Sequence, residues 1–163
     1  MLDLVETAVR VTNHSDVAVA WARCAARLLD GVFQGQPVSA ALDAAAAEAP
    51  DPDTLKQART GQTLDAVGAG DTFGRTCYLH EAMPVIFHIL SHAQSYPEAV
   101  RANIHCGGDS CGRAWVIGPV MAALHGVGGD RGVPLSWLGQ LNGAAGHYRK
   151  AERLVRGEWD KAG

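Results

Sequence analysis

The stretch HCGGDSCGR, residues 105–113, holds two cysteines, three glycines, an aspartate and an arginine within nine positions. Adjacent glycines can adopt backbone angles that other residues avoid, and they let a ligand approach the chain closely. Asp109 and Ser110 stand at the expected start of an apolar helix, where amide groups and the helix dipole favour an anion such as phosphate. Asp109 could equally cap that helix without any ligand. The residues alone leave these two interpretations open.

Metal binding through nitrogen and sulfur is an alternative chemistry. His105, Cys106 and Cys111 could offer zinc ligands, but no second CxxC or HxxxH pair follows at a suitable spacing. His88 and His92 are four residues apart, so a helix would present both to one ion, but the glutamate of an HExxH motif is absent. We therefore interpret the two histidines as polar caps or partly buried residues.

The segment DAVGAGDTF, residues 65–73, is similar to the GAGD motif of ribokinase-like sugar kinases. In that family the glycine amides form an anion hole and the aspartate acts as a base. The kinase motif requires parallel strands upstream, whereas the segments before residue 65 are alanine-rich and helical in pattern. We therefore predict a glycine-rich loop from Thr60 to Arg75 and keep a sugar-kinase fragment as a third interpretation.

The composition is typical of one globular domain, since 47% of the 163 residues are hydrophobic and 19% are charged. A net charge of −3 without a basic cluster gives no electrostatic support for nucleic-acid binding. No apolar run is long enough to span a membrane, and the first residues do not resemble a signal peptide. We predict a soluble, cytoplasmic protein whose four cysteines stay reduced.

Apolar residues recur at three- and four-residue steps through most of the chain, which indicates helices. The predicted helices cover residues 16–30, 38–49, 51–58, 81–93, 97–104, 113–126 and 144–161, with a short helix starting at Pro134. The expected caps are Asn13, Ser15 or Asp16 for the first helix, Asp51 or Asp53 for the third, and Ser95 for the fifth. We expect Gly31 to end the first helix and Pro119 to kink or split the long apolar one. No stretch alternates apolar and polar residues as a β-strand does, so we predict an all-α single domain over residues 1–163.

Three segments resemble, in the same order, the ADP-ribosylglycohydrolase family, in the branch that includes the J1-type crystallins. They are VRVTNHSDVAVAWARCAARLLDGVFQG, FGRTCYLHEAMPVIFHIL, and EAVRANIHCGGDSCGRAWVIGPVMAALHG followed by GVPLSW. Together they span roughly residues 7–142 and leave residues 143–163 as a helical tail, with Leu154, Val155 and Trp159 as expected contacts. The resemblance implies an all-α fold that binds two magnesium ions and hydrolyses the N- or O-glycosidic bond of ADP-ribose conjugates.

The resemblance also assigns roles to individual residues. Gly107, Gly108 and Asp109 match the Gly-Gly-Asp of the family's metal motif, which makes Asp109 a magnesium ligand. Ser110 matches the threonine or serine that follows, so Gly107, Gly108 and Ser110 are expected to line the substrate site. Asn13 falls where many members carry a substrate-lining histidine, and it is therefore a further expected substrate contact.

Two departures from the family pattern affect the expected metal site. The family's second aspartate falls on Cys111 and the next threonine on Gly112, and a thiol is a poor magnesium ligand. The family also takes ligands from an N-terminal Thr-Asp-Asp segment that has no counterpart here, so we expect the chain to correspond to the C-terminal half of the fold. Asp71 is the one nearby acid considered as a substitute. We predict weak magnesium binding and little or no hydrolysis by this chain alone.

Two functions remain from this resemblance. The first is magnesium-assisted hydrolysis of ADP-ribose from an ADP-ribosylated substrate, with the ions orienting the ribose hydroxyls and activating a water. The alternative is a catalytically silent relative, either a structural, crystallin-like protein or a ligand-binding one. A half-fold would expose apolar helix faces, so we also predict self-association.

Overall fold

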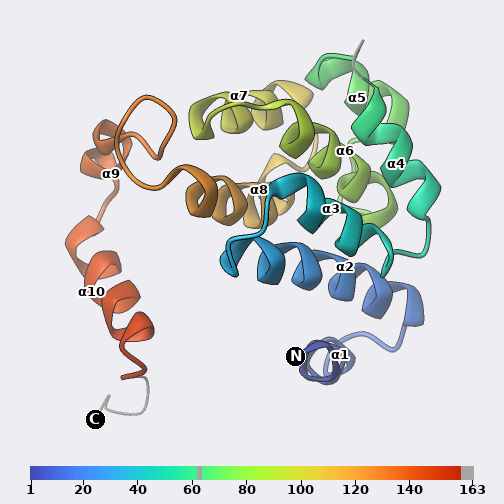
Figure 1. The fold of residues 1–163 in the computed structure, drawn as a ribbon, viewed down its shortest axis with the longest axis horizontal. Coiled ribbons are helices and arrows are strands. Elements are labelled where there is room, and N and C mark those ends of the chain that lie inside the picture. The colour runs from blue at the N-terminus through green and yellow to red at the C-terminus, as the bar shows by residue number, and fades with distance from the viewer. Residues whose placement is uncertain (62–63, 159–163) are drawn as a thin grey trace.

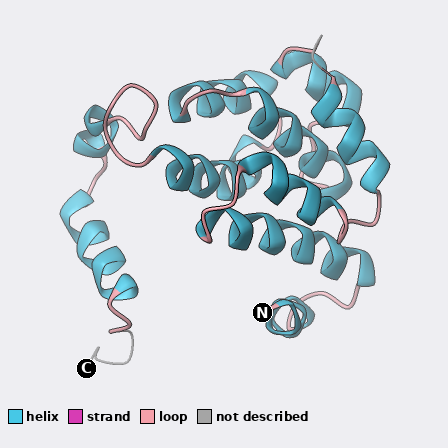
Figure 2. Ribbon diagram, viewed as in Figure 1, coloured by secondary structure: helices cyan, strands magenta, loops and turns pink. Residues whose placement is uncertain are grey.

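The computed structural model describes residues 1–61 and 64–158, and within them the secondary structure is helical (Figure 1, Figure 2). The described part contains no strand, only an isolated bridge between Val127 and Val133. The prediction of an all-α chain is confirmed. The helices are α1 (Leu2–Arg10), α2 (Asp16–Phe33), α3 (Val38–Ala46), α4 (Pro52–Thr60), α5 (Ala66–Phe73), α6 (Leu79–His92), α7 (Tyr96–Cys106), α8 (Ser110–His125), α9 (Leu135–Gln140) and α10 (Ala144–Val155).

Side-chain caps start most of the helices that surround the core. Each capping oxygen accepts a hydrogen bond from the backbone N–H three residues further along, which satisfies one of the amides that a helix leaves open. The predicted caps Ser15, Asp51 and Ser95 all act in this way. Helix α1 was not predicted, and ion pairs of Arg10 with Asp16 and of Glu6 with Arg23 join it to α2.

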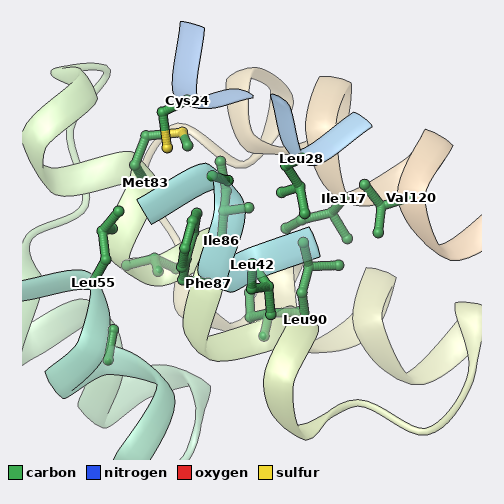
Figure 3. Packing of buried hydrophobic residues seen from close by; sticks show 14 of the residues in the cluster. Cys24, Leu28, Leu42, Leu55, Met83, Ile86, Phe87, Leu90, Ile117 and Val120 are labelled. Carbon is green, nitrogen blue, oxygen red and sulfur yellow. The ribbon is translucent and has the colours of Figure 1, made fainter. Parts of the chain in front are cut away.

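Helix α6 is the centre of the molecule. Its residues 82–90 are all buried, which is typical of a helix enclosed by others on every side. Helices α2, α3, α4 and α8 send apolar side chains toward it, as Figure 3 shows. The labelled members of this core are Cys24, Leu28, Leu42, Leu55, Met83, Ile86, Phe87, Leu90, Ile117 and Val120.

The predicted glycine-rich loop over residues 60–75 is wrong, because residues 66–73 form helix α5. Asp65 caps this helix by accepting a hydrogen bond from the Gly68 amide at 2.7 Å. Gly70 lies so close to α7 that an added Cβ would be 2.8 Å from the Cys106 sulfur. Tertiary packing therefore offsets the low helix propensity of the glycines. No strand precedes residue 65 in the described chain, so the sugar-kinase interpretation loses the sheet that it requires.

Two further expectations are wrong, namely that Gly31 ends α2 and that Pro119 splits α8, whereas a kink at Pro119 stays a prediction. Gly31 does not end α2 but lies inside it, where its lack of a side chain lets α3 approach: an added Cβ would be 3.1 Å from that of Ala41. Pro119 does not split α8, which continues from Ser110 to His125. Pro119 lies on the exposed face of α8, where solvent can satisfy the carbonyl that the proline leaves without a donor.

Helices α9 and α10 form an arm that extends from the C-terminal end of α8, away from the other helices (Figure 1). Trp137 of α9 packs edge-on against Tyr96, with ring centroids 6.1 Å apart. Leu154 and Val155, which were expected to make contacts, are 51% and 87% exposed. Trp159 lies outside the described residues. Helix α10 ends at Val155, and no helix of the described chain is long and apolar enough to cross a membrane.

Candidate ligand site at the glycine–glycine–aspartate turn

The turn between α7 and α8 depends on two glycines in left-handed conformations. Gly107 ends α7 with φ of 76° and Gly108 follows with φ of 64°. A side chain at Gly108 would overlap the backbone carbonyl of Arg75, and the same carbonyl accepts a hydrogen bond from the Asp109 amide at 2.9 Å. The turn is therefore held against the loop that follows α5. A turn between two helices was predicted over residues 105–112; the turn is confirmed, but it covers only residues 107–109.

The loop that supports this turn is itself fastened to α6. The Thr76 amide donates a hydrogen bond to the Glu81 carboxylate at 2.9 Å, and this bond lowers the pKa of Glu81. Gly74, with φ of 102°, leaves the space that the Glu81 carboxylate occupies. Glu81 thus fixes the loop, and the Arg75 carbonyl in turn fixes the position of Asp109.

Asp109 caps helix α8. One of its carboxylate oxygens accepts a hydrogen bond from the Gly112 amide at 3.0 Å, as expected for an N-cap. The side chain also borders a pocket of about 180 Å³ between α2, α6 and α8. Among the described residues that line this pocket Asp109 is the only acid, and the rest are mostly apolar: Trp21, Ala22, Ala25, Cys77, Leu79, Ala82, Met83, Ile86, Gly112 and Val116.

Arg113 is a buried residue beside this turn that was not predicted from the sequence. It is fully buried, and its guanidinium donates to the Asn103 side-chain oxygen at 2.8 Å and to the Gly107 carbonyl at 2.5 Å. The side-chain NH2 group of Asn103 donates in turn to the Ser110 carbonyl at 2.8 Å. The C-terminal carbonyls of α7 thus balance the charge of Arg113, as the helix dipole favours. One guanidinium nitrogen, Nη1, has no partner in the described structure.

A signal for Arg113 was present in the sequence. It stands four residues before Ile117 and seven before Val120, both of which are buried on the inner face of α8. A residue at that spacing occupies the same face of a helix. Burial of Arg113 could therefore have been predicted, whereas its partners across the turn could not.

The candidate zinc ligands do not converge. Cys106 is buried in the core, whereas Cys111 is exposed and lines a groove between α7 and α8. That groove and the Asp109 pocket have separate linings, so Cys111 and Asp109 do not face one space. Asp71, the considered substitute ligand, forms an ion pair with Arg75 at 2.7 Å.

Asn13 lies in the linker between α1 and α2. Its side chain is exposed and donates a hydrogen bond to the Thr12 hydroxyl at 3.0 Å. It is not among the residues that line the Asp109 pocket. The structure therefore leaves its assignment as a substrate contact a prediction.

His88 and His92 stack in α6 with ring centroids 4.4 Å apart. Nδ1 of His88 bonds to the Ala58 carbonyl at 3.0 Å, and Nδ1 of His92 bonds to the His88 carbonyl at 2.7 Å. Burial lowers the pKa of His88, which favours the neutral ring. The interpretation of the two histidines as polar caps or partly buried residues is confirmed for His92, which is half-buried, whereas His88 is fully buried and bonds to the backbone.

Comparison with known proteins identifies the family. The family model described as ADP-ribosylglycohydrolase matches residues 1–162. The chain belongs to the ADP-ribosylglycohydrolase family. The match confirms the resemblance and extends it beyond residues 7–142, whereas the J1-crystallin branch stays a prediction. No curated protein and no solved structure gives a significant match.

In the described residues of this ADP-ribosylglycohydrolase-family chain, the donor groups do not fit a two-magnesium centre. Magnesium prefers several oxygen ligands in near-octahedral geometry. In the described residues no three His, Cys, Asp or Glu side chains are grouped so that they could hold a metal ion. The Asp109 carboxylate already bonds the Gly112 amide, and it faces a mostly apolar pocket.

Proposed function

We propose that this chain is a member of the ADP-ribosylglycohydrolase family that retains the helical scaffold but does not hydrolyse ADP-ribose conjugates on its own. The observation that supports this proposal is the role of Asp109. The one acid of the Gly-Gly-Asp motif caps α8, and no second acid borders its pocket in the described chain. A single carboxylate binds magnesium weakly, because removing the water bound to the ion is costly in free energy.

The neighbouring groups support the same proposal. Cys111 replaces the expected second carboxylate, and its thiol lies in a different groove from Asp109. The pocket beside Asp109, at about 180 Å³, is smaller than the roughly 300–1,000 Å³ that is usual for ligand sites. We infer that ADP-ribosylated substrates, which the family suggests, are not enclosed by this chain in the described conformation.

The test measures release of ADP-ribose from proteins carrying N-linked and O-linked ADP-ribose, with and without magnesium. Calorimetry of the same preparation with magnesium and with ADP-ribose reports binding directly. Asp109→Asn is the matched variant, because asparagine also caps helices. We expect no release above the protein-free control and no heat of magnesium binding, for both the natural chain and the variant.

The second candidate is an active glycohydrolase, and the family match over residues 1–162 favours it. Magnesium-dependent turnover that Asp109→Asn abolishes would contradict the first proposal and establish the second. Binding of ADP-ribose without turnover would leave the chain as a ligand-binding relative.

A further inference from the structure

Helix α10 carries an apolar stripe that the described chain leaves uncovered. The residues Ala144, Tyr148, Ala151 and Val155 recur at steps of four, three and four, so they fall within one narrow arc of the helix. Tyr148 is 70% exposed and Val155 is 87% exposed, and no residue of α10 is buried. The basic residues of α10 lie mainly on the opposite side.

An uncovered helix of this length needs a partner. Helix α10 has 12 residues, and isolated helices shorter than about 12–15 residues are marginal in water because nucleation is costly. Most helices in proteins are stabilised by packing of an amphipathic face. Helix α10 therefore requires an apolar surface of matching shape.

The outer face of α8 offers such a surface. Two adjoining hollows of about 420 and 380 Å³ share the residues Tyr96, Cys111, Ala114 and Gly118, and we call them the α7–α8 groove. Trp115, which borders it, is 81% exposed. The inner face of α8 is buried in the core, so α8 is apolar on both sides, as is typical of a helix that is covered on both.

We propose that the α7–α8 groove receives helix α10 of a second copy, so that two copies exchange their C-terminal arms. The dimensions agree: the groove runs from Cys111 to Ala122 along α8, and the stripe runs from Ala144 to Val155. Each covers 11 helical steps, or about 17 Å. The small residues of the groove floor leave room for Tyr148. A two-fold exchange forms the same contact twice and is therefore closed.

The course of the arm favours a second copy over the groove of the same chain. Three residues link α9 to α10, and among them Gly143 has φ of 72°. In this arrangement α10 points away from the other helices (Figure 1), so a second copy can bind it without a change in the linker.

Charge favours association of the arm with a second copy. Residues 144–156 contain four of the 14 Lys and Arg residues and one of the 17 Asp and Glu residues. The arm segment therefore carries +3 and the rest of the chain −6. A basic arm on an acidic second copy lowers the repulsion between the two.

The first test compares dimerisation constants from sedimentation equilibrium. Tyr148→Ser removes the central side chain of the stripe, and Trp115→Ser removes the wall of the groove. Arg149→Lys, on the opposite side of α10, keeps both the charge of the arm and its helix propensity and is the control. We expect the natural chain and Arg149→Lys to dimerise, and the other two to dimerise at least about tenfold more weakly. A monomeric natural chain, or equal weakening by the control, would overturn the proposal.

The second test locates the contact by a disulfide. In a Cys77→Ser background Cys111 is the one exposed thiol, and it lies at one end of the groove. Ala144→Cys and Val155→Cys place a thiol at opposite ends of the stripe, so a docked helix brings one of them to Cys111. We expect one of the two variants to form a disulfide-linked dimer under mild oxidation. Equal cross-linking by both, by neither, or within one chain would each overturn the proposal.

Discussion

Replacing Asp109 by alanine and by asparagine separates its role as a helix cap from a role as a metal ligand. The carboxylate accepts one hydrogen bond, from the Gly112 amide at 3.0 Å. Loss of an N-cap costs about 1 kcal/mol, and loss of the negative charge at the start of α8 costs about 0.3 kcal/mol more at low salt. We expect Asp109→Ala to lower the free energy of unfolding by the sum of both, and Asp109→Asn by the charge contribution alone, because asparagine caps as well as aspartate.

Urea unfolding followed by circular dichroism at 222 nm measures these differences, and calorimetry gives the change in melting temperature. For a chain of this size about 1 kcal/mol corresponds to roughly 2–4 °C. High salt should remove the small effect of Asp109→Asn, since salt screens the helix dipole. The reasoning is refuted if asparagine costs as much as alanine, or if magnesium stabilises the natural chain and not Asp109→Asn.

Three further predictions concern the surroundings of the site. Gly108→Ala should lower the free energy of unfolding more than Gly107→Ala in urea titrations, because both need positive φ but only at Gly108 would a side chain overlap another backbone. In alkylation at pH 8 followed by mass spectrometry, two thiols of the folded chain should react, and Cys24 should not, because burial raises its pKa to about 12. The folded state keeps the pKa of His88 below its usual 6.5, so stability is complete above pH 6.5 and falls as the pH drops below it. Urea titrations above and below pH 6.5 should show that His88→Gln removes part of this loss of stability at low pH.

Local signals in the sequence predicted the starts of the helices well. Ser15, Asp51 and Ser95 cap helices because their short side chains reach an amide three residues away, which depends on no distant contact. The same logic located Asp109 at the start of α8. The family was also visible in the sequence, because its metal motif is a contiguous stretch.

Contacts between distant segments were not predictable in this way. Helix α5 was missed because its glycines argue against a helix, whereas Gly70 is needed for the close approach of Cys106. The hydrogen bond from the Asp109 amide to the Arg75 carbonyl joins residues more than 30 positions apart, and a backbone acceptor leaves no trace in the side-chain pattern. The sequence could therefore indicate which residues belong to the site, but not that Asp109 and Cys111 face different spaces.

Burial of Arg113 has a consequence for the order of folding. Removing a guanidinium without a partner from water costs several kcal/mol, roughly, so Arg113 can be buried only where hydrogen-bond acceptors are already in place. Its acceptors are the carbonyl of Gly107 and the side chain of Asn103, six and ten residues earlier. The two acceptors lie side by side only when helix α7 and the turn after it have formed. Closing so short a loop costs little entropy. We therefore expect helices α7 and α8 to assemble as a hairpin before they pack against α6, and the turn that carries Asp109 to open only when the whole hairpin does.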